Sequence, residues 1–304
     1  MKARLISSLV TLGRFMLVLI FLIPFATALA QESAEQAKTE KDKRPVRRPF
    51  EGSTLIDNQT PVIYPKNTLE MIIHHRFGPV KNGVSDLYGI YGPSNIRLGL
   101  NYSITNKIML GLGTTKNKKY QDLQWKYNIL QQTRSNSIPV GLAYYGNISL
   151  DARNKDYFGA QYQFTNRFSY FSQLIIWHRI NDKISVQVAP SFSHINSVDS
   201  AYEHDKVAVS FGGKFRFSNQ MAFIVNYDLP LHLQGIQEHL PLNIKPSPNL
   251  GLGIEITTST HVFQIFIANA QGILPHDNVM WNTNPIGKIE GYMIGFNLTR
   301  MWGF

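Results

Sequence analysis

Apolar and polar residues alternate with a period of two along most of the chain after residue 67, and this pattern constrains the fold more than any other feature. Successive side chains of a strand point to opposite faces, so the alternation predicts strands with one apolar face. We expect about twelve strands, and ten to fourteen are compatible with the pattern, because residues 157–164 either extend the sixth strand or form an additional one. In 168–179 the apolar face is not defined, since four large apolar residues run together. The expected strands are 68–77, 95–104, 108–114, 123–129, 138–145, 168–179, 184–193, 207–217, 221–228, 250–257, 262–268 and 290–304.

The connections between these segments alternate in length. Short turns are expected at 105–107, 181–183, 218–220 and 258–260, with 131–137 a slightly longer member of this class. Long segments are expected at 78–94, 147–167, 195–206, 229–248 and 270–289, with 116–121 a short member of that class. Outer-membrane barrels have short periplasmic turns and long extracellular loops. The pattern therefore predicts an all-β fold, a single transmembrane antiparallel β-barrel of residues 68–304 in the outer membrane of a Gram-negative cell.

A soluble β-sandwich or lipocalin-like barrel also alternates, but its polar face meets water and carries many charged residues. Here only 16% of residues are charged and 43% are hydrophobic, and the polar face consists largely of glycine, serine, asparagine, glutamine and alanine. Aromatic residues gather toward strand ends, as they do in the girdles of membrane barrels. These observations favour the membrane barrel. The girdle candidates are Phe77, Tyr102, Tyr127, Tyr144, Phe192, Phe217, Tyr227, Tyr292 and Trp302.

The first 30 residues predict a cleaved signal peptide. Lys2 and Arg4 precede an apolar run at 15–25, and the small-x-small pattern of a cleavage site lies at 28–30. The alternative, a membrane anchor, needs about 20 apolar residues, and this run is shorter and contains a proline. We expect residues 31–67 to form a flexible periplasmic segment, because the first twenty of them are highly charged and almost without large apolar side chains.

The chain contains no cysteine, which excludes disulfides, thiolate metal sites and a lipid-anchored N-terminal cysteine. The formal net charge of +10 is dispersed over signal peptide, tail and barrel, so it does not call for a nucleic-acid partner. Arg44, Arg47 and Arg48 form a basic end of the tail, which we interpret as a solvated linker rather than a patch for an acidic partner.

Six motifs resemble those of a known family. They are HHRFG (74–78), YGPSNIRLGLNYSIT (91–105), APSFSHIN (189–196), GGKFRFS (212–218), HVFQIFIAN (261–269) and GFNLTR (295–300). They are similar to the Bacteroidetes β-barrel family catalogued as domain of unknown function 5777, over roughly residues 50–304. The resemblance implies an outer-membrane barrel and supplies no activity or binding residue. The final strand, which ends in Phe304, resembles the signal by which the barrel-assembly machinery recognises its substrates.

The polar face predicts a charged lumen, and our leading hypothesis is a narrow pore or channel for small solutes. Five cations and three anions on this face favour anionic solutes, unless they merely pair with one another across the lumen. Inward glycines are frequent, for example Gly99, Gly113 and Gly251. We attribute them to barrel curvature rather than to lumen space for a solute or to room for large neighbours. The predicted lumen-facing charges are Glu70, Arg76, Arg97, Lys126, Lys214, Arg216, Asp228 and Glu255.

Two alternatives are a non-conducting binding or structural barrel that acts through its extracellular loops and, with less support, a lipid-modifying enzyme. His74 and His75 are adjacent, so they point to opposite faces and cannot share a ligand, and Ser193 and His194 have the same geometry. The sequence therefore gives no catalytic, cofactor-binding or metal-ligating candidate, and we expect no enzyme and no cofactor. The expected partners are outer-membrane lipid and lipopolysaccharide, contacted by Lys116, Lys118 and Lys119, the barrel-assembly machinery, and a small-molecule solute, without nucleic acid.

Overall fold

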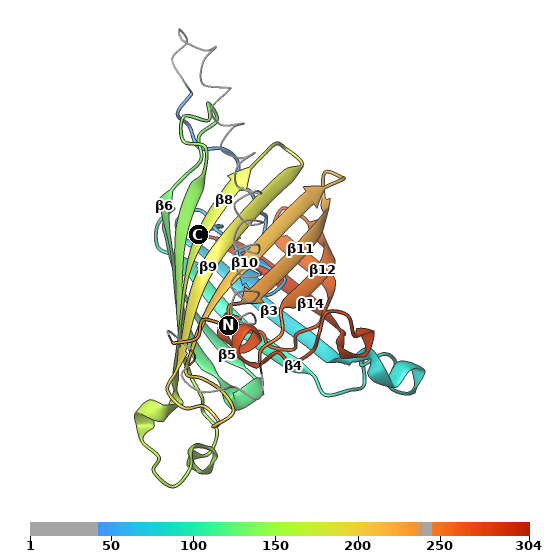
Figure 1. The fold of residues 1–304 in the computed structure, drawn as a ribbon. Coiled ribbons are helices and arrows are strands. Elements are labelled where there is room, and N and C mark those ends of the chain that lie inside the picture. The colour runs from blue at the N-terminus through green and yellow to red at the C-terminus, as the bar shows by residue number, and fades with distance from the viewer. Residues whose placement is uncertain (1–41, 236–237, 239–244) are drawn as a thin grey trace, which may run out of the picture. The chain divides into compact units, whose positions relative to one another are not determined.

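A closed β-barrel dominates the structure, a computed structural model that describes residues 42–235, 238 and 245–304 (Figure 1). The predicted signal peptide, residues 1–30, lies outside the described residues. Within the described part, residues 42–44 and 133–139 form one small unit, in which the Arg134 and Ser135 backbone amides donate to the carbonyls of Arg44 and Asp42. Residues 45–132 and 140–304 form the second unit, which contains the whole barrel.

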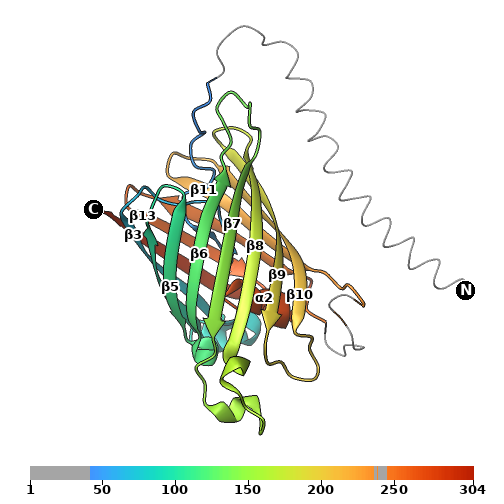
Figure 2. The same cartoon turned by 90° about the vertical axis from the view of Figure 1, so that its left-hand side faces the viewer.

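The barrel is built from twelve antiparallel strands, each paired with its neighbours in sequence, and it closes through the pairing of β14 with β3. Figures 1 and 2 show the strands running at a tilt around the barrel, as closure of a sheet requires. The strands are β3 (Thr68–Pro79), β4 (Asn95–Ser103), β5 (Ile108–Thr115), β6 (Gln121–Leu130), β7 (Gly141–Leu150), β8 (Phe168–Arg179), β9 (Ile184–Ile195), β10 (Asp205–Arg216), β11 (Met221–Pro230), β12 (Asn249–Thr257), β13 (His261–Ala268) and β14 (Met293–Gly303).

These strands confirm the predicted fold, a transmembrane antiparallel barrel with twelve strands. Residues 157–164 add no strand: η3 (Lys155–Phe158) and η4 (Phe164–Arg167) occupy the ends of this segment. In β8 the lumen side takes Phe171, Ile175 and Trp177, each at most 6% exposed. In β8 apolar residues point to both faces, so the sequence does not show which face is turned toward the lumen.

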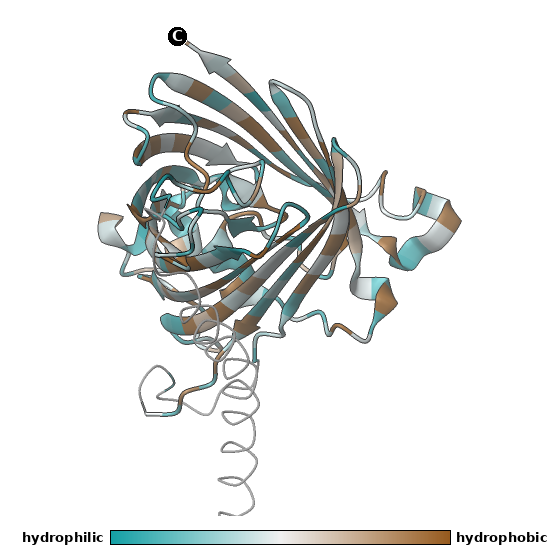
Figure 3. Cartoon of the chain, turned by 90° about the horizontal axis from the view of Figure 1, so that it is seen from above, coloured by the Kyte–Doolittle hydropathy of each residue, from teal (hydrophilic) through white to brown (hydrophobic). Residues whose placement is uncertain are grey.

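The outer surface of the barrel is apolar and the inner surface is polar. On β4, Leu98 and Leu100 are 43% and 52% exposed, whereas Arg97 and Asn101, which point inward, are each 3% exposed. Seen from above in Figure 3, apolar and polar bands alternate along the strands. An exposed apolar belt on every side is unfavourable in water and favourable in lipid, so the sheet is suited to a bilayer.

The two ends of the barrel differ in the length of their connections, as the sequence predicts. The short periplasmic turns follow β4, β8, β10 and β12, and a longer one follows β6. In the part of the chain that the structure describes, no helix is both long and apolar enough to cross a membrane. The long extracellular connections carry η1 (Val80–Asp86), η2 (Asn117–Lys119), η3, η4, α2 (Pro275–Trp281) and η5 (Ile289–Gly291).

Candidate functional site: a plug bound to the lumen wall

Residues 50–64, which we call the plug, fill part of the lumen. Their apolar side chains pack with the wall residues Ile224, Phe266 and Ala268 in one buried cluster. The plug contains a small hairpin, β1 (Thr54–Leu55) and β2 (Asn58–Gln59). Its hydrogen bonds reach strands all around the barrel, from β3 through β6, β8, β9, β11, β13 and β14, which places it inside the ring of strands. The expectation that residues 31–67 form a flexible segment is therefore corrected for the plug.

The hairpin tip is held by Arg76 of β3. Its guanidinium lies 2.5 Å from Asp57 Oδ1, and the two side chains are 0% and 2% exposed. Arg76 also donates to the Ile56 carbonyl (3.2 Å), and so does Asn297 of β14 (2.8 Å). Ile56 adopts a φ of 57°, an unfavourable backbone conformation for a β-branched residue, so the wall holds the tip in a strained turn.

Burial raises the pKa of Asp57, although the Arg76 charge opposes this effect. In buried ion pairs the cost of desolvating the two charges commonly offsets their attraction. The pair consequently fixes the position of the tip more than it adds net stability. Removing one partner is a different matter, because the other charge then stays buried without compensation.

The second strand of the hairpin is bound from the opposite part of the wall. Asn58 Nδ2 donates to Asn226 Oδ1 and to Asp228 Oδ1 of β11, both at 2.5 Å. Gln173 of β8 donates to Asn58 Oδ1 at 3.2 Å. Gln187 of β9 donates to the Gln59 carbonyl at 2.8 Å. Side-chain amides of the wall therefore form hydrogen bonds with polar groups of the plug that no neighbouring strand pairs.

The residues before the hairpin are bound in the same way. Ser53 donates to Glu70 Oε1 at 2.6 Å, and Lys126 of β6 donates to the Ser53 carbonyl at 3.0 Å. Gln264 of β13 donates to the Thr54 carbonyl at 3.0 Å. These buried polar groups of the wall all have partners in the plug, so plug and wall form one hydrogen-bonded unit.

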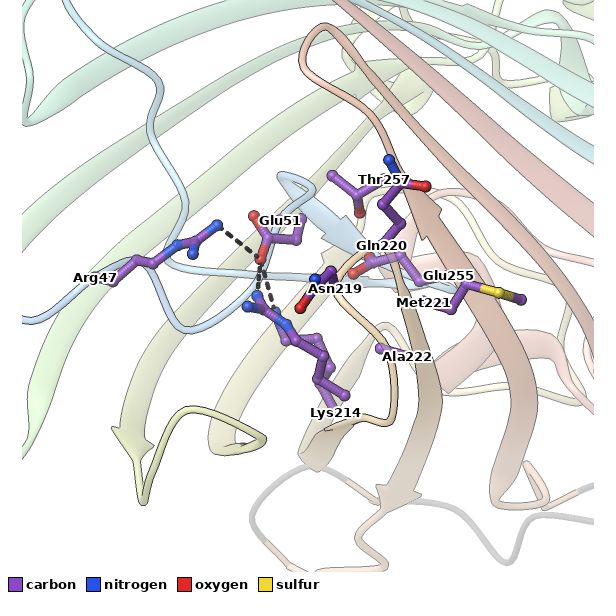
Figure 4. Close-up of a pocket in the computed structure, with 10 residues that line it drawn as sticks. Arg47, Glu51, Lys214, Asn219, Gln220, Met221, Ala222, Glu255 and Thr257 are labelled. Atoms are coloured by element: carbon purple, nitrogen blue, oxygen red, sulfur yellow. Dashed lines mark hydrogen bonds and ion pairs between the residues drawn. The ribbon is translucent and has the colours of Figure 1, made fainter.

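At the beginning of the plug, Glu51 contacts a cluster of cations near the short turns (Figure 4). Glu51 Oε1 lies 3.4 Å from Lys214 Nζ and 3.9 Å from Arg47 Nη2, and it forms an ion pair with Arg216. Burial raises the pKa of Glu51, and the charges of Lys214, Arg216 and Arg47 lower it. Together these charges outweigh the effect of burial, so the pKa of Glu51 lies below its usual value. Glu51 is therefore ionised at neutral pH and ties the plug to β10.

The structure places the eight predicted lumen charges as follows. Six of them contact the plug, and Lys214 and Arg216 share Glu51. Arg97 instead pairs with Asp122 on β6 at 2.6 Å, and Glu255 accepts from Gln264 at 2.9 Å. The six that contact the plug are Glu70, Arg76, Lys126, Lys214, Arg216 and Asp228.

Sequence reasoning missed two lumen charges. Asp122 points to the same face as Lys126 but lies just before the expected strand 123–129. Lys206 likewise points to the same face as Lys214 but lies just before the expected strand 207–217. Lys206 pairs with Glu238 at 2.9 Å, with both side chains at most 3% exposed. Extending both expected strands by one residue at the same parity finds these two side chains.

Several inward glycines lie directly against large side chains. A Cβ atom on Gly251 would lie 2.9 Å from Ile56 Cγ2 of the plug, and one on Gly113 would lie 2.2 Å from Arg97 Nη2. A Cβ atom on Gly212 would lie 2.9 Å from Leu55 Cδ2. The wall is therefore shaped to fit the plug at two glycines.

The adjacent histidines lie on opposite faces of β3, as predicted. His74 is 4% exposed in the lumen, while the His75 ring stacks on Phe296 at 5.0 Å. Ser193 is buried, and the half-exposed His194 contacts Asp205 at 2.6 Å. Among the described residues, no three His, Asp or Glu side chains gather as metal ligands do.

The chain was compared with curated proteins and with solved structures. A search of curated proteins found no match. Among solved structures, the chain is similar to the NanC porin (8% identity over 78% of this chain and 99% of that chain, TM-score 0.47). It is also similar to an outer membrane channel from Pseudomonas putida F1 (9% identity, 79% and 97%, TM-score 0.49) and to outer membrane phospholipase A from Escherichia coli (11%, 78% and 91%, TM-score 0.39). These low identities and scores assign no function.

A family model described as a membrane bound beta barrel domain (DUF5777) matches residues 50–302. The match begins at Phe50, the first residue of the plug, and extends into β14, so plug and barrel fall within one domain. The match covers most of the chain, and the protein therefore belongs to the family of membrane bound beta barrel domains, DUF5777.

Proposed function

We propose that the protein passes small solutes across the outer membrane, with a preference for anions, and that the plug closes its lumen until it is displaced. Export by a signal peptide cleaved after Ala30 is part of this proposal. The observation that carries it is the use of plug carboxylates to neutralise wall cations. Asp57 pairs with Arg76, and Glu51 pairs with Lys214 and Arg216.

Withdrawal of the plug changes the charge of the lumen. Among the described residues, all ion pairs of these three wall cations are made with the plug. Displacing the plug removes two carboxylates and leaves six wall charges without their plug partners. Four of them are cations (Arg76, Lys126, Lys214 and Arg216) and two are carboxylates (Glu70 and Asp228). Because opposite charges are attracted into a narrow, low-dielectric passage, the opened lumen favours anions.

A planar-bilayer measurement tests this function. The full chain and the Glu51→Gln variant are recorded in a KCl gradient, and the reversal potential gives the ion selectivity. We expect rare openings for the unaltered chain, more frequent openings for Glu51→Gln, and chloride selectivity in both. Cation-selective openings contradict the preference for anions.

The second candidate function is a non-conducting binding or structural barrel. The observation that favours it is the density of buried hydrogen bonds between plug and wall, which also fits a permanent filling of the lumen. Absence of openings in both proteins, with correctly folded barrel in the bilayer, supports this candidate and overturns the channel. We further propose that the barrel has no catalytic activity, and hydrolysis of phospholipid by the purified protein would contradict this.

A further inference from the structure

A second polar cavity lies at the other end of the barrel, among the long loops. Its volume is about 330 Å³, at the lower end of the range for small-molecule sites. The lining comes from the connections after β5, β7, β9 and β13 and from the adjoining ends of β8 and β9, where η3 and η4 extend from the barrel (Figure 2). We call it the outer cavity. It shares no lining residue with the pocket beside Glu51.

The floor of the outer cavity is buried and aromatic. Tyr120 is 2% exposed, and its hydroxyl lies 3.4 Å from Asp277 Oδ1 of α2. Trp281, at the end of α2, packs edge-on against Tyr202 with 4.6 Å between ring centroids. The buried Trp281 Nε1 has no hydrogen-bond partner within the described chain, which leaves one donor in the wall without a protein acceptor.

Two arginines of the 151–167 loop build a fixed wall. Arg153 binds Asp151 with two nitrogens, at 3.0 and 2.6 Å. Arg167 Nη1 donates to the carbonyls of Asp151 and Arg153, both at 2.7 Å, and its Nε donates to the Tyr162 hydroxyl at 2.6 Å. The bonds within the loop hold both arginines, so the wall is formed before any ligand arrives.

Lys118 differs from these arginines. Its ammonium group lies 4.3 Å from the centroid of the Trp281 ring and 5.7 Å from that of Tyr120. It forms no ion pair with any residue that the structure describes. Burial lowers the pKa of its ammonium group. Its backbone φ is 51°, a conformation that non-glycine residues rarely adopt. The chain thus accepts local strain and holds at the cavity a cation that has no ion-pair partner among the described residues.

The three lysines expected to contact lipopolysaccharide do not all lie on the surface. Lys116 and Lys119 are exposed, but Lys118 turns away from solvent and lines the outer cavity. The lysine that sequence reasoning grouped with two surface cations therefore belongs to a site.

We propose that the outer cavity binds a small hydroxylated organic acid whose carboxylate or phosphate group pairs with Lys118. The cavity offers hydrogen-bonding groups for hydroxyls in Asp151, Asn166, Ser169, Ser197 and Asp199, beside the aromatic side chains. Its three cations outnumber its two carboxylates, and Asp151 is already paired with Arg153. An anion at Lys118 supplies the missing counter-charge at a site that is partly shielded from water.

Binding to the closed barrel tests the site without any need for conduction, so its outcome is independent of the proposed channel. Isothermal titration of the full chain in detergent compares four compounds on one sugar ring: glucuronate, glucose 6-phosphate, glucose and glucosamine. We expect saturable binding of one or both acids, at least tenfold weaker binding of glucose, and the weakest binding for the cationic glucosamine. Which acid binds more tightly distinguishes a carboxylate from a phosphate ligand.

Substitutions then locate the site. Lys118→Met is expected to weaken binding of the acid at least tenfold, and Lys118→Arg to retain most of it. Lys116→Met removes an exposed cation of the same loop and is expected to change the affinity less than twofold. Heat-modifiable migration in gels verifies that each variant is folded. The proposal is overturned if glucuronate, glucose 6-phosphate and glucose bind with equal affinity, or if neither acid saturates the protein up to about 10 mM. An unchanged affinity in Lys118→Met overturns it as well.

Discussion

Replacement of Asp57 by alanine tests how firmly the wall holds the plug. The substitution leaves the Arg76 guanidinium buried and without its carboxylate, and breaking a buried ion pair in this way costs about 3–5 kcal/mol. Arg76 keeps weaker acceptors at the Ile56 carbonyl (3.2 Å) and Asn297 Oδ1 (3.0 Å), so the lower limit applies. About 3 kcal/mol corresponds to a shift of roughly 100-fold in the equilibrium between docked and released plug.

Amide hydrogen exchange followed by mass spectrometry measures this shift directly. In Asp57→Ala, peptides that cover residues 50–64 are expected to exchange up to about 100-fold faster, while peptides of the barrel strands keep their protection. Asp182→Ala is the matched control, because Asp182 forms an ion pair of 2.6 Å with Arg179 but is 94% exposed. Surface pairs of this kind contribute about 0–1 kcal/mol. Unchanged exchange of the plug, or equal loss of protection in plug and strands, refutes the reasoning.

Two further predictions concern the charge and the fit of the plug. Because the pKa of Glu51 is lowered, its ion pairs contribute their full stability above its usual pKa of 4.5. This stability is lost as the pH falls through the lowered pKa. Protease cleavage within the plug should therefore increase in strongly acidic buffer. In Glu51→Gln this increase should be largely absent, and an identical pH profile in both proteins contradicts the assignment. Gly251→Val places side-chain atoms where Ile56 lies, and overpacking of about 1–3 kcal/mol should raise the frequency of openings by about five- to 150-fold with the barrel intact. Gly287→Val is its control, since a Cβ atom there meets nothing within 4 Å, and openings equally frequent in both variants argue against the glycine's role.

The barrel was accessible from sequence because lipid imposes a strict rule on each strand. Every outward position between the girdles must be apolar, so the period of two is clear in eleven of the twelve strands. β8 is the exception, because Phe171 and Ile175 also fill the lumen side with apolar groups. Parity likewise gave the inward charges, since it follows from the strand alone.

The plug was not accessible in the same way. Its segment is short and polar, and its partners are wall residues far away in sequence, such as Asp228 for Asn58. The available signal was compositional: Phe50, Leu55, Ile56 and Tyr64 contrast with the charged residues that precede them. Alternation along a strand shows whether a side chain points into the lumen, but not at which level along the barrel axis it lies. It could therefore not show that Arg76 contacts Asp57 or that Lys214 contacts Glu51.

A reversible covalent lock tests the central claim, that the lumen opens only when the plug moves. The chain contains no cysteine, so an introduced pair has no competing thiols. A Cβ atom on Gly251 would lie 3.6 Å from Ile56 Cβ, within the range of about 3.5–4.5 Å found in disulfides. The double variant Ile56→Cys and Gly251→Cys is recorded in planar bilayers before and after reduction, with each single variant as control. We predict no openings in the oxidised double variant, anion-selective openings after reduction, and no effect of the reductant on the single variants. Openings of equal frequency in the oxidised and reduced protein, with the disulfide verified by mass spectrometry, would contradict the account.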